Sequence, residues 1–190
     1  MSNSNNLYGE LHLIIGPMFS GKTTALIDVY NANIRLNNKV AVINYYKDRR
    51  YHKSMLSTHD NVMIECINCV KINEVLSNPT VLDAYTIIIN EGQFFEDVYE
   101  TAMHLVEKLH KKVYICGLDG DFKRNKFGKL LDLIPLCDTV TKLHANCVSC
   151  KANALFSYRI THDINQVVIG TNNYIPLCRN CYNVYINSTK

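Results

Sequence analysis

The sequence predicts an α/β fold: a mostly parallel β-sheet flanked by helices, followed by a small second domain. Runs of β-branched residues alternate with helical periodicity up to about residue 143, which is the pattern of βαβ units. A glycine-rich turn at residues 16–23 lies between the first predicted strand and the first predicted helix. Beyond residue 143 helical periodicity ends and two C-x-x-C pairs occur. We therefore expect one domain over residues 1–143 and another over residues 144–190.

The elements of the first domain follow from composition and period. Short runs of aliphatic, β-branched and aromatic residues predict strands, and amphipathic runs predict helices. Residues 47–61 are polar and charged without a clear period, and we expect a loop there. In chain order, the predicted elements are strand 11–15, helix 22–36, strand 39–46, strand 62–67, helix 72–77, strand 86–89, helix 96–110 and strand 113–118.

The helix over residues 96–110 has the clearest amphipathic pattern in the chain. Its apolar stripe is formed by Val98, Ala102, Leu105, Val106 and Leu109. In the second domain, two strand-like runs at residues 154–161 and 166–171 lie between the two cysteine pairs. We expect these runs to form the strands of a small cysteine-bearing unit.

Composition limits the classes of function. The chain has 190 residues, of which 47% are hydrophobic and 19% charged, so a packed core is expected. A net charge of +3 is too weak a bias to predict nucleic-acid binding. The polar start, MSNSNNLYGE, lacks the pattern of a signal peptide, and no apolar run reaches membrane-spanning length. We expect a cytoplasmic protein with neither nucleic acid nor membrane as partner, and with cysteines that stay reduced.

Residues 16–23 read GPMFSGKT and match the P-loop pattern G-x-x-x-x-G-K-[ST]. In such a turn, backbone N–H groups and the N-terminus of the following helix bind phosphate oxygens. The motif predicts a P-loop (RecA-like) domain for a nucleoside triphosphate, and leaves an ATPase motor, a GTPase switch and a kinase open. Lys22 would reach the β- and γ-phosphates, and the Thr23 hydroxyl would face Mg²⁺. The candidate phosphate-binding residues are Gly16, Pro17, Met18, Phe19, Ser20, Gly21, Lys22 and Thr23.

Four cysteines predict a structural zinc site. Cys147 and Cys150 form one C-x-x-C pair, and Cys178 and Cys181 form the other. Two such pairs supply the four thiolates of a closed tetrahedral Zn²⁺ site, which would tie residues 151–177 into a clamped loop. A third pair, Cys66 and Cys69, has no matching pair; it is read as buried thiols, with a redox couple or extra ligands as alternatives.

Several strings stand in order along the chain: GPMFSGKTT, KDRRY with STHD downstream, NEGQFF, LDGDFKRNKFG, CVSC and CRNC. From about Leu11 to Tyr182 this order resembles the type II thymidine kinase family of cells and large DNA viruses. The resemblance implies transfer of the γ-phosphoryl group of ATP, with Mg²⁺, to the 5′-hydroxyl of thymidine, with deoxyuridine also accepted. It also implies DNA-precursor salvage, a homotetramer, and feedback binding of thymidine triphosphate.

The resemblance also implies roles for individual residues. Glu91, in the EGQ string, matches the catalytic base. Positions on the ATP and phosphate side are matched by Asp48, Arg50, Asn90 and Gln93, of which Gln93 also lines the nucleoside pocket. The nucleoside is closed over by a "lasso" in the zinc-bearing domain. The residues implied in nucleoside binding are Phe94, Leu118, Phe122, Ser157, Arg159 (near the phosphates), Val168, Ile169 and Tyr174.

Two departures from the family pattern bear on function. Asn90 stands where the family usually has the aspartate that supports Mg²⁺, so we expect a working site with a weakened metal shell and a higher Mg²⁺ requirement. Asp121 replaces a small hydroxyl residue beside the nucleoside pocket, which leaves the range of nucleosides open. Two other functions remain as alternatives: a P-loop ATPase stimulated by nucleic acid, and a nucleotide-binding protein without catalysis.

Overall fold

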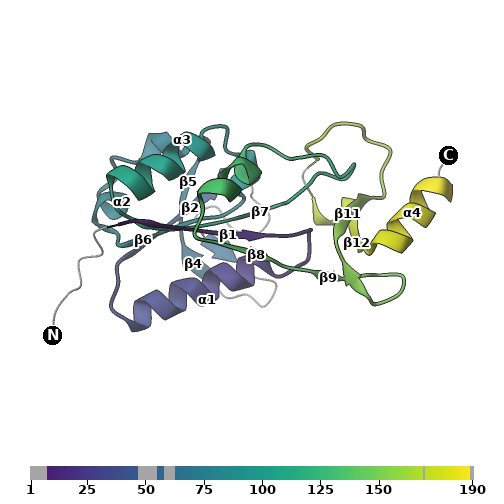
Figure 1. Cartoon of the computed structure of the whole chain (residues 1–190), viewed down its shortest axis with the longest axis horizontal. Coiled ribbons are helices and arrows are strands. Elements are labelled where there is room, and N and C mark those ends of the chain that lie inside the picture. The colour runs from purple at the N-terminus through teal and green to yellow at the C-terminus, as the bar shows by residue number, and fades with distance from the viewer. Residues whose placement is uncertain (1–7, 47–54, 58–62, 169, 189–190) are drawn as a thin grey trace.

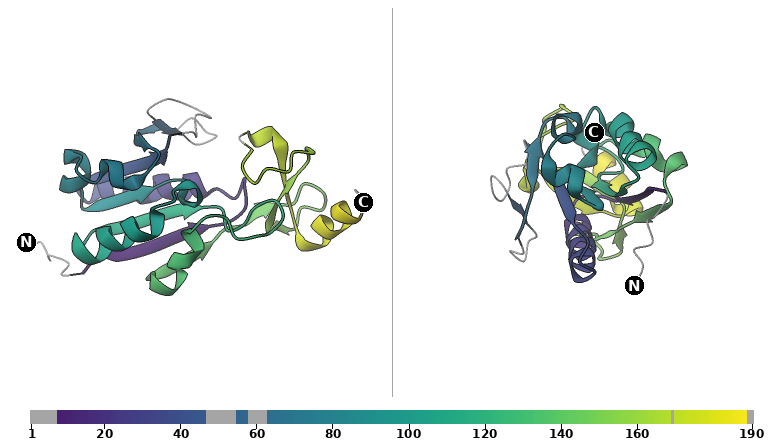
Figure 2. Two further views of the ribbon diagram at one scale, coloured as in Figure 1. Left: turned by 90° about the horizontal axis from the view of Figure 1, so that it is seen from above. Right: turned by 90° about the vertical axis from the view of Figure 1, so that its left-hand side faces the viewer.

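The computed structural model describes residues 8–46, 55–57, 63–168 and 170–188. Residues 8–143, here called the sheet region, hold the large β-sheet, and residues 144–188, here called the cysteine region, lie beyond one end of it (Figure 1). The left view of Figure 2 shows the same end-to-end arrangement from above, and the right view looks along the long axis of the molecule. Within the described residues, the helices are too short or too polar to cross a membrane.

Six of the described strands form one parallel sheet in the order β5-β2-β6-β7-β1-β8. The four inner strands are largely buried, and β6 is buried at every residue, as its TIII sequence predicts. Parallel strands end at the same edge of a sheet, so the polar residues that follow them meet there. The strands are β1 Glu10–Ile15, β2 Val40–Tyr45, β5 Ile67–Cys69, β6 Thr86–Ile89, β7 Lys112–Gly117 and β8 Thr139–Lys142.

Helices cover both faces of this sheet (Figure 1). On one face, α1 (Lys22–Arg35) packs Leu26 and Ile27 against the strands. On the other face, α3 (Val98–Met103) continues into the π-helix η3 (His104–Lys108), and the predicted apolar stripe is confirmed in the core. The remaining short helices of the sheet region are η1 Ile72–Val75, α2 Pro79–Asp83, η2 Gly92–Phe94 and η4 Leu130–Leu136.

Some expected elements of the sheet region are wrong in detail. The single strand predicted at residues 62–67 is two: β4 (Met63–Glu65) pairs antiparallel with β3 (Met55–Ser57), and β5 joins the main sheet. β3 lies in the predicted loop, most of which falls outside the described residues. The helix predicted at 72–77 is a shorter 3₁₀ turn, and α2 follows it because Asn78 caps it by accepting from the Thr80 N–H. Sequence patterns also missed β8, whose residues are all exposed.

The described part of the cysteine region contains two small antiparallel sheets, the short 3₁₀ helix η5 (Thr171–Asn173) and a longer helix. β9 (Ala145–Asn146) pairs with β10 (Asn153–Ala154), and β11 (Phe156–Arg159) pairs with β12 (Tyr174–Leu177). The expectation of a strand at residues 166–171 is wrong, because that segment is part of a long connection and β12 supplies the partner strand. The expectation that helices end near residue 143 is also wrong: α4 (Arg179–Ser188) closes the chain and buries Tyr182.

Candidate active site

The P-loop, residues 16–23, connects β1 to α1 as the motif predicts. Phe19 (φ 65°) and Gly21 (φ 82°) have left-handed backbone conformations, which fold the turn back before α1 begins at Lys22. Gly16 is required by space, since a Cβ there would lie 2.6 Å from the Leu143 carbonyl oxygen. The Lys22 Nζ donates to the Pro17 carbonyl at 2.7 Å, so the ammonium is held inside the turn. This arrangement is suited to phosphate.

Glu91 lies directly after β6 in a left-handed conformation (φ 59°, ψ 43°) and is half-buried. The Gln93 Nε2 donates to the Glu91 carboxylate at 2.6 Å, and the Gln93 Oε1 accepts from the Leu118 N–H at 3.0 Å. Gln93 is buried between two glycines. A Cβ at Gly117 would lie 2.4 Å from the Gln93 Oε1, and one at Gly128 would lie 2.2 Å from the Gln93 carbonyl oxygen. The Glu91 carboxylate is therefore oriented by a side chain that has little room to move.

Asn90 is buried and belongs to a row of amides that crosses the end of the sheet. Its Nδ2 donates to the Asn44 Oδ1 at 2.8 Å, and its Oδ1 accepts from the Cys116 thiol at 3.0 Å. The Asn44 Nδ2 donates in turn to the Asn68 Oδ1 at 3.1 Å. We call Asn68, Asn44, Asn90 and Cys116 the amide row. Sequence reasoning missed Asn44, although a polar residue inside the apolar run KVAVINYY was the available signal.

Aromatic rings lie around the loops that follow β6 and β7. Phe94 stacks on Tyr45, with ring centroids 5.1 Å apart, and meets the edge of Phe127 at 5.3 Å. Phe122 is half-buried, and the Arg159 guanidinium lies 3.7 Å from the centroid of its ring. Leu118 lies beside the loop that follows β6, because its N–H donates to the Gln93 Oε1. The sequence-predicted Phe94, Leu118 and Phe122 thus come from two neighbouring strand ends.

A hydrogen bond joins the cysteine region to the P-loop. Ser157, buried in β11, accepts at its Oγ from the Met18 backbone N–H at 2.9 Å. Two residues further along the same strand, Arg159 is also buried. The face of β11 that reaches the P-loop is therefore the face that carries Arg159.

The segment 160–173, here called the lasso, folds around Arg159. The Arg159 guanidinium donates to the carbonyls of Asp163, Asn165 and Gln166 and to the Tyr174 hydroxyl. The Tyr174 hydroxyl donates to the Val168 carbonyl at 3.1 Å. The Arg159 Nε is buried and has no hydrogen-bond partner among the described residues. The structure thus directs this cation to lasso carbonyls.

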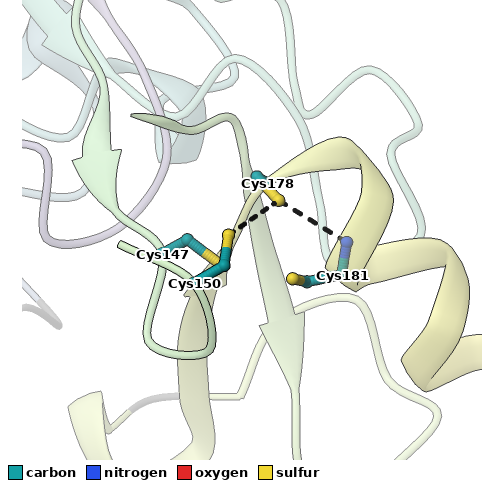
Figure 3. Close-up of side chains that lie close together, drawn as sticks. All are labelled: Cys147, Cys150, Cys178 and Cys181. Carbon is teal, nitrogen blue, oxygen red and sulfur yellow. Dashed lines mark hydrogen bonds between the residues drawn. The ribbon is translucent and has the colours of Figure 1, made fainter. Parts of the chain in front are cut away.

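The four predicted cysteines come together from a turn after β9 and from the start of α4 (Figure 3). Their Sγ atoms all lie within 4.8 Å of one another, and those of Cys150 and Cys178 are 3.6 Å apart. A tetrahedral Zn²⁺ with bonds of about 2.3 Å separates its sulfurs by a similar distance, so the set fits the ion. Burial opposes ionisation of the Cys147 thiol, but hydrogen bonds from the backbone of Cys178, Cys150 and Ser149 outweigh it and lower its pKa to about 6.

The remaining candidate residues are placed as follows. Asp48, Arg50 and Ile169 lie outside the described residues. Cys66 and Cys69 are buried, and burial raises the pKa of the Cys69 thiol to about 12, which keeps it protonated. The Cys69 thiol therefore lacks the thiolate character that a redox couple needs.

Comparisons with known proteins point to one family. The family model described as thymidine kinase matches residues 9–182. Over 180 residues, the chain is 39% identical to a thymidine kinase of Oryza sativa subsp. japonica, covering 92% of this chain and 66% of the rice protein. It is 40% identical to thymidine kinase a of Arabidopsis thaliana, covering 92% of this chain and 75% of the Arabidopsis protein. It is 39% identical to a thymidine kinase of Sheeppox virus (strain KS-1), covering 92% of this chain and 97% of the viral protein.

Proposed function

The chain belongs to the thymidine kinase family, and from this premise we propose that it phosphorylates thymidine at the expense of ATP. The γ-phosphoryl group passes to the 5′-hydroxyl of the nucleoside, giving thymidine monophosphate and ADP. Deoxyuridine, which differs by one methyl group, is a second substrate. The product class is a DNA precursor, so the reaction is one of salvage.

The observation that carries the proposal is the placement of Glu91. Its carboxylate is oriented by Gln93 at the same sheet edge at which β1 enters the P-loop. Glu91 takes the proton of the 5′-hydroxyl as the nucleoside oxygen bonds to the γ-phosphorus. The bond between that phosphorus and the β,γ-bridging oxygen breaks, and ADP leaves with its electrons. Phosphoryl transfer needs little more than such positioning and charge neutralisation.

The phosphates are bound by the P-loop backbone and by Lys22, and the family resemblance implies a contribution from Asp48 and Arg50. Mg²⁺, when bound with ATP, neutralises charge on the β- and γ-phosphates. Thr23, at the start of α1, is the hydroxyl that would hold it. Asn90 lends no negative charge, and its amide is already hydrogen-bonded to Asn44 and Cys116. We propose that this metal shell is weaker than one with an acid at position 90.

The nucleoside lies between the sheet region and the lasso. Phe94 and Phe122 offer ring faces to a flat base, and Leu118 offers apolar contact. Ser157, Arg159 and Tyr174 hold the lasso in place. The backbone of Val168 and Ile169 reads the carbonyls and the N–H of thymine.

A structural Zn²⁺ on Cys147, Cys150, Cys178 and Cys181 ties the lasso to α4. The cysteine region is a domain of its own, over residues 144–190, that closes on a domain over residues 1–143. We further propose a homotetramer in the cytoplasm that is subject to feedback inhibition by thymidine triphosphate.

The test is formation of 5′-monophosphate by the purified zinc-loaded protein with ATP, a Mg²⁺ series and a panel of nucleosides. Glu91→Gln, which keeps the shape of the side chain and removes the base, is measured beside it. Thymidine monophosphate that forms with the parent and falls about 10²–10⁴-fold in the variant supports the kinase and its base. Bound ATP and thymidine without product at any Mg²⁺ would show a nucleotide-binding protein instead.

A further inference from the structure

Asp121 is a buried carboxylate in the loop that follows β7, where it is 7% exposed. One of its oxygens, Oδ1, accepts from the backbone N–H groups of Lys123 at 2.9 Å and Asn125 at 2.8 Å. These two bonds fix the direction of the carboxylate within its own loop. The other oxygen, Oδ2, is left facing the cysteine region.

The Asp121 Oδ2 accepts from the Gln166 Nε2 at 3.0 Å. Gln166 lies in the middle of the lasso, and its backbone carbonyl accepts from the Arg159 Nη2 at 3.0 Å. The same lasso residue is thus held at its main chain by the cysteine region and at its side chain by the sheet region. Forty-five positions separate Asp121 from Gln166, so the bond joins distant parts of the chain.

The loop that carries Asp121 is itself anchored to the cysteine region. The carbonyl of its neighbour Phe122 accepts from the Tyr182 hydroxyl of α4 at 2.5 Å. The Phe122 ring lies under the Arg159 guanidinium, 3.7 Å from it. Asp121 and Phe122 therefore form one unit with the lasso: the carboxylate accepts from the Gln166 side chain, and the aromatic ring contacts the Arg159 guanidinium.

We propose that Asp121 is a positioning residue for nucleoside binding, which holds the lasso against the Phe122 loop through the amide of Gln166. This role rests on the proposed function, because it assumes that the nucleoside lies between the lasso and Phe122. Asp121 does not touch the nucleoside; both of its oxygens are used within the protein. Its loss therefore weakens thymidine binding and leaves ATP binding and the chemical step intact.

The decisive variant is Gln166→Glu, which places a carboxylate against the Asp121 carboxylate and opens the contact. We expect the KM for thymidine to rise about tenfold, the scale of one hydrogen bond to a charged group, with kcat and the KM for ATP changed less than about twofold. Asp121→Asn with Gln166→Glu rebuilds the bond with donor and acceptor exchanged, because the new amide donates to the new carboxylate. We expect the double variant to return to within about twofold of the parent.

Asn165→Asp is the matched control, since it adds the same charge one residue away and on an exposed side chain. A thymidine KM raised equally in this control, or a double variant that fails to recover, would overturn the proposal. Hydrogen exchange of the amides of residues 160–173 gives a readout that does not depend on activity. Exchange should accelerate in Gln166→Glu and return to the parental rate in the double variant.

The two proposals fail separately. A parent that makes no thymidine monophosphate, but whose lasso amides respond and recover as described, removes the proposed function and keeps the lasso contact. An active parent whose lasso exchange and thymidine KM are unchanged in Gln166→Glu removes the contact and keeps the function.

Discussion

The two regions of the molecule are held together by different means. Apolar side chains cover both faces of the sheet in the sheet region, in two clusters that include every residue of β6 except Thr86. Among the described residues of the cysteine region, the buried cluster has five members: Ala145, Cys147, Ala154, Leu177 and Tyr182. A unit of this size buries too little apolar surface to be stable by itself, and a metal commonly supplies the difference. In the cysteine region, directional contacts of four thiols and one guanidinium take the place of extensive apolar burial as the source of stability.

This contrast predicts different responses to substitution. Loss of a methylene group matters most in the sheet region, because it leaves a cavity in a dense core. Loss of a single ligand or hydrogen-bond donor matters most in the cysteine region, because few other contacts compensate. Four measurements compare the regions on this basis.

The largest effect is expected from Cys147→Ser, which removes a buried thiol of the proposed zinc site. Structural zinc contributes roughly 10 kcal/mol to folding in small zinc units, so the cysteine region should lose its ordered structure and thymidine phosphorylation should be abolished. Metal analysis and hydrogen exchange by region measure this. ATP binding by the sheet region should persist, weakened several-fold by loss of the bond between Ser157 and Met18. Cys137→Ser, at a half-buried thiol outside the cluster, is the control. Equal loss of protection in both regions would contradict the contrast.

The second effect is expected from Ile88→Ala in β6, where Ile88 is fully buried. The cavity should lower the free energy of unfolding by about 2–5 kcal/mol. Urea unfolding measures it, with Val140→Ala on the exposed strand β8 as control. Zinc content should stay unchanged. A cost below that of Val140→Ala would mean that the sheet core relaxes to fill the space.

The third effect concerns the amide row. Asn90→Asp places a carboxylate oxygen against the Asn44 Oδ1, and turning the Asn44 amide breaks its bond to Asn68. We expect a loss of about 1–3 kcal/mol in stability, together with a lower Mg²⁺ requirement for ATP binding. Thermal unfolding and Mg²⁺ titration of ATP binding measure the two parts. Asn37→Asp in the exposed turn after α1 controls for the added charge. Unchanged stability would show that the row adapts without cost.

The smallest effect is expected from Ser157→Ala, at the hydrogen bond that joins β11 to the P-loop. Its removal leaves the Met18 N–H without its partner, which costs about 1 kcal/mol and should weaken ATP binding several-fold. Calorimetric titration with ATP measures the change, and Ser188→Ala near the end of α4 is the control. No change in ATP affinity would mean that the P-loop keeps its shape without the cysteine region.

The sheet region was largely predictable from sequence, because its strands are apolar runs whose partners follow from the βαβ pattern. The P-loop, β6 and the stripe of α3 are examples. The thiol cluster was predictable too, since cysteine spacing carries its own geometric signal. Hydrogen bonds between polar side chains far apart in the sequence were not predictable. The amide row and the Gln166–Asp121 contact depend on how the strands and loops are arranged in space.

The errors in the cysteine region have a physical cause. The run QVVIGT, residues 166–171, is rich in β-branched residues, yet it lies in the lasso, where its backbone is held by Arg159 and Tyr174. The strand that pairs with β11 contains Pro176, a residue that argues against a strand. α4 escaped notice because only Tyr182 is fully buried, so its apolar stripe is narrow. In these segments, a few long-range contacts override the local secondary-structure propensity of the sequence.

The amide row has a consequence for evolutionary change. Its hydrogen bonds run in one direction, from Cys116 through Asn90 and Asn44 to Asn68, so each side chain fixes which group its neighbour must present. An acid at position 90 becomes acceptable once position 44 offers a donor in that direction. Sequences that differ at one of these positions should differ at the other, although neither residue needs to touch a substrate.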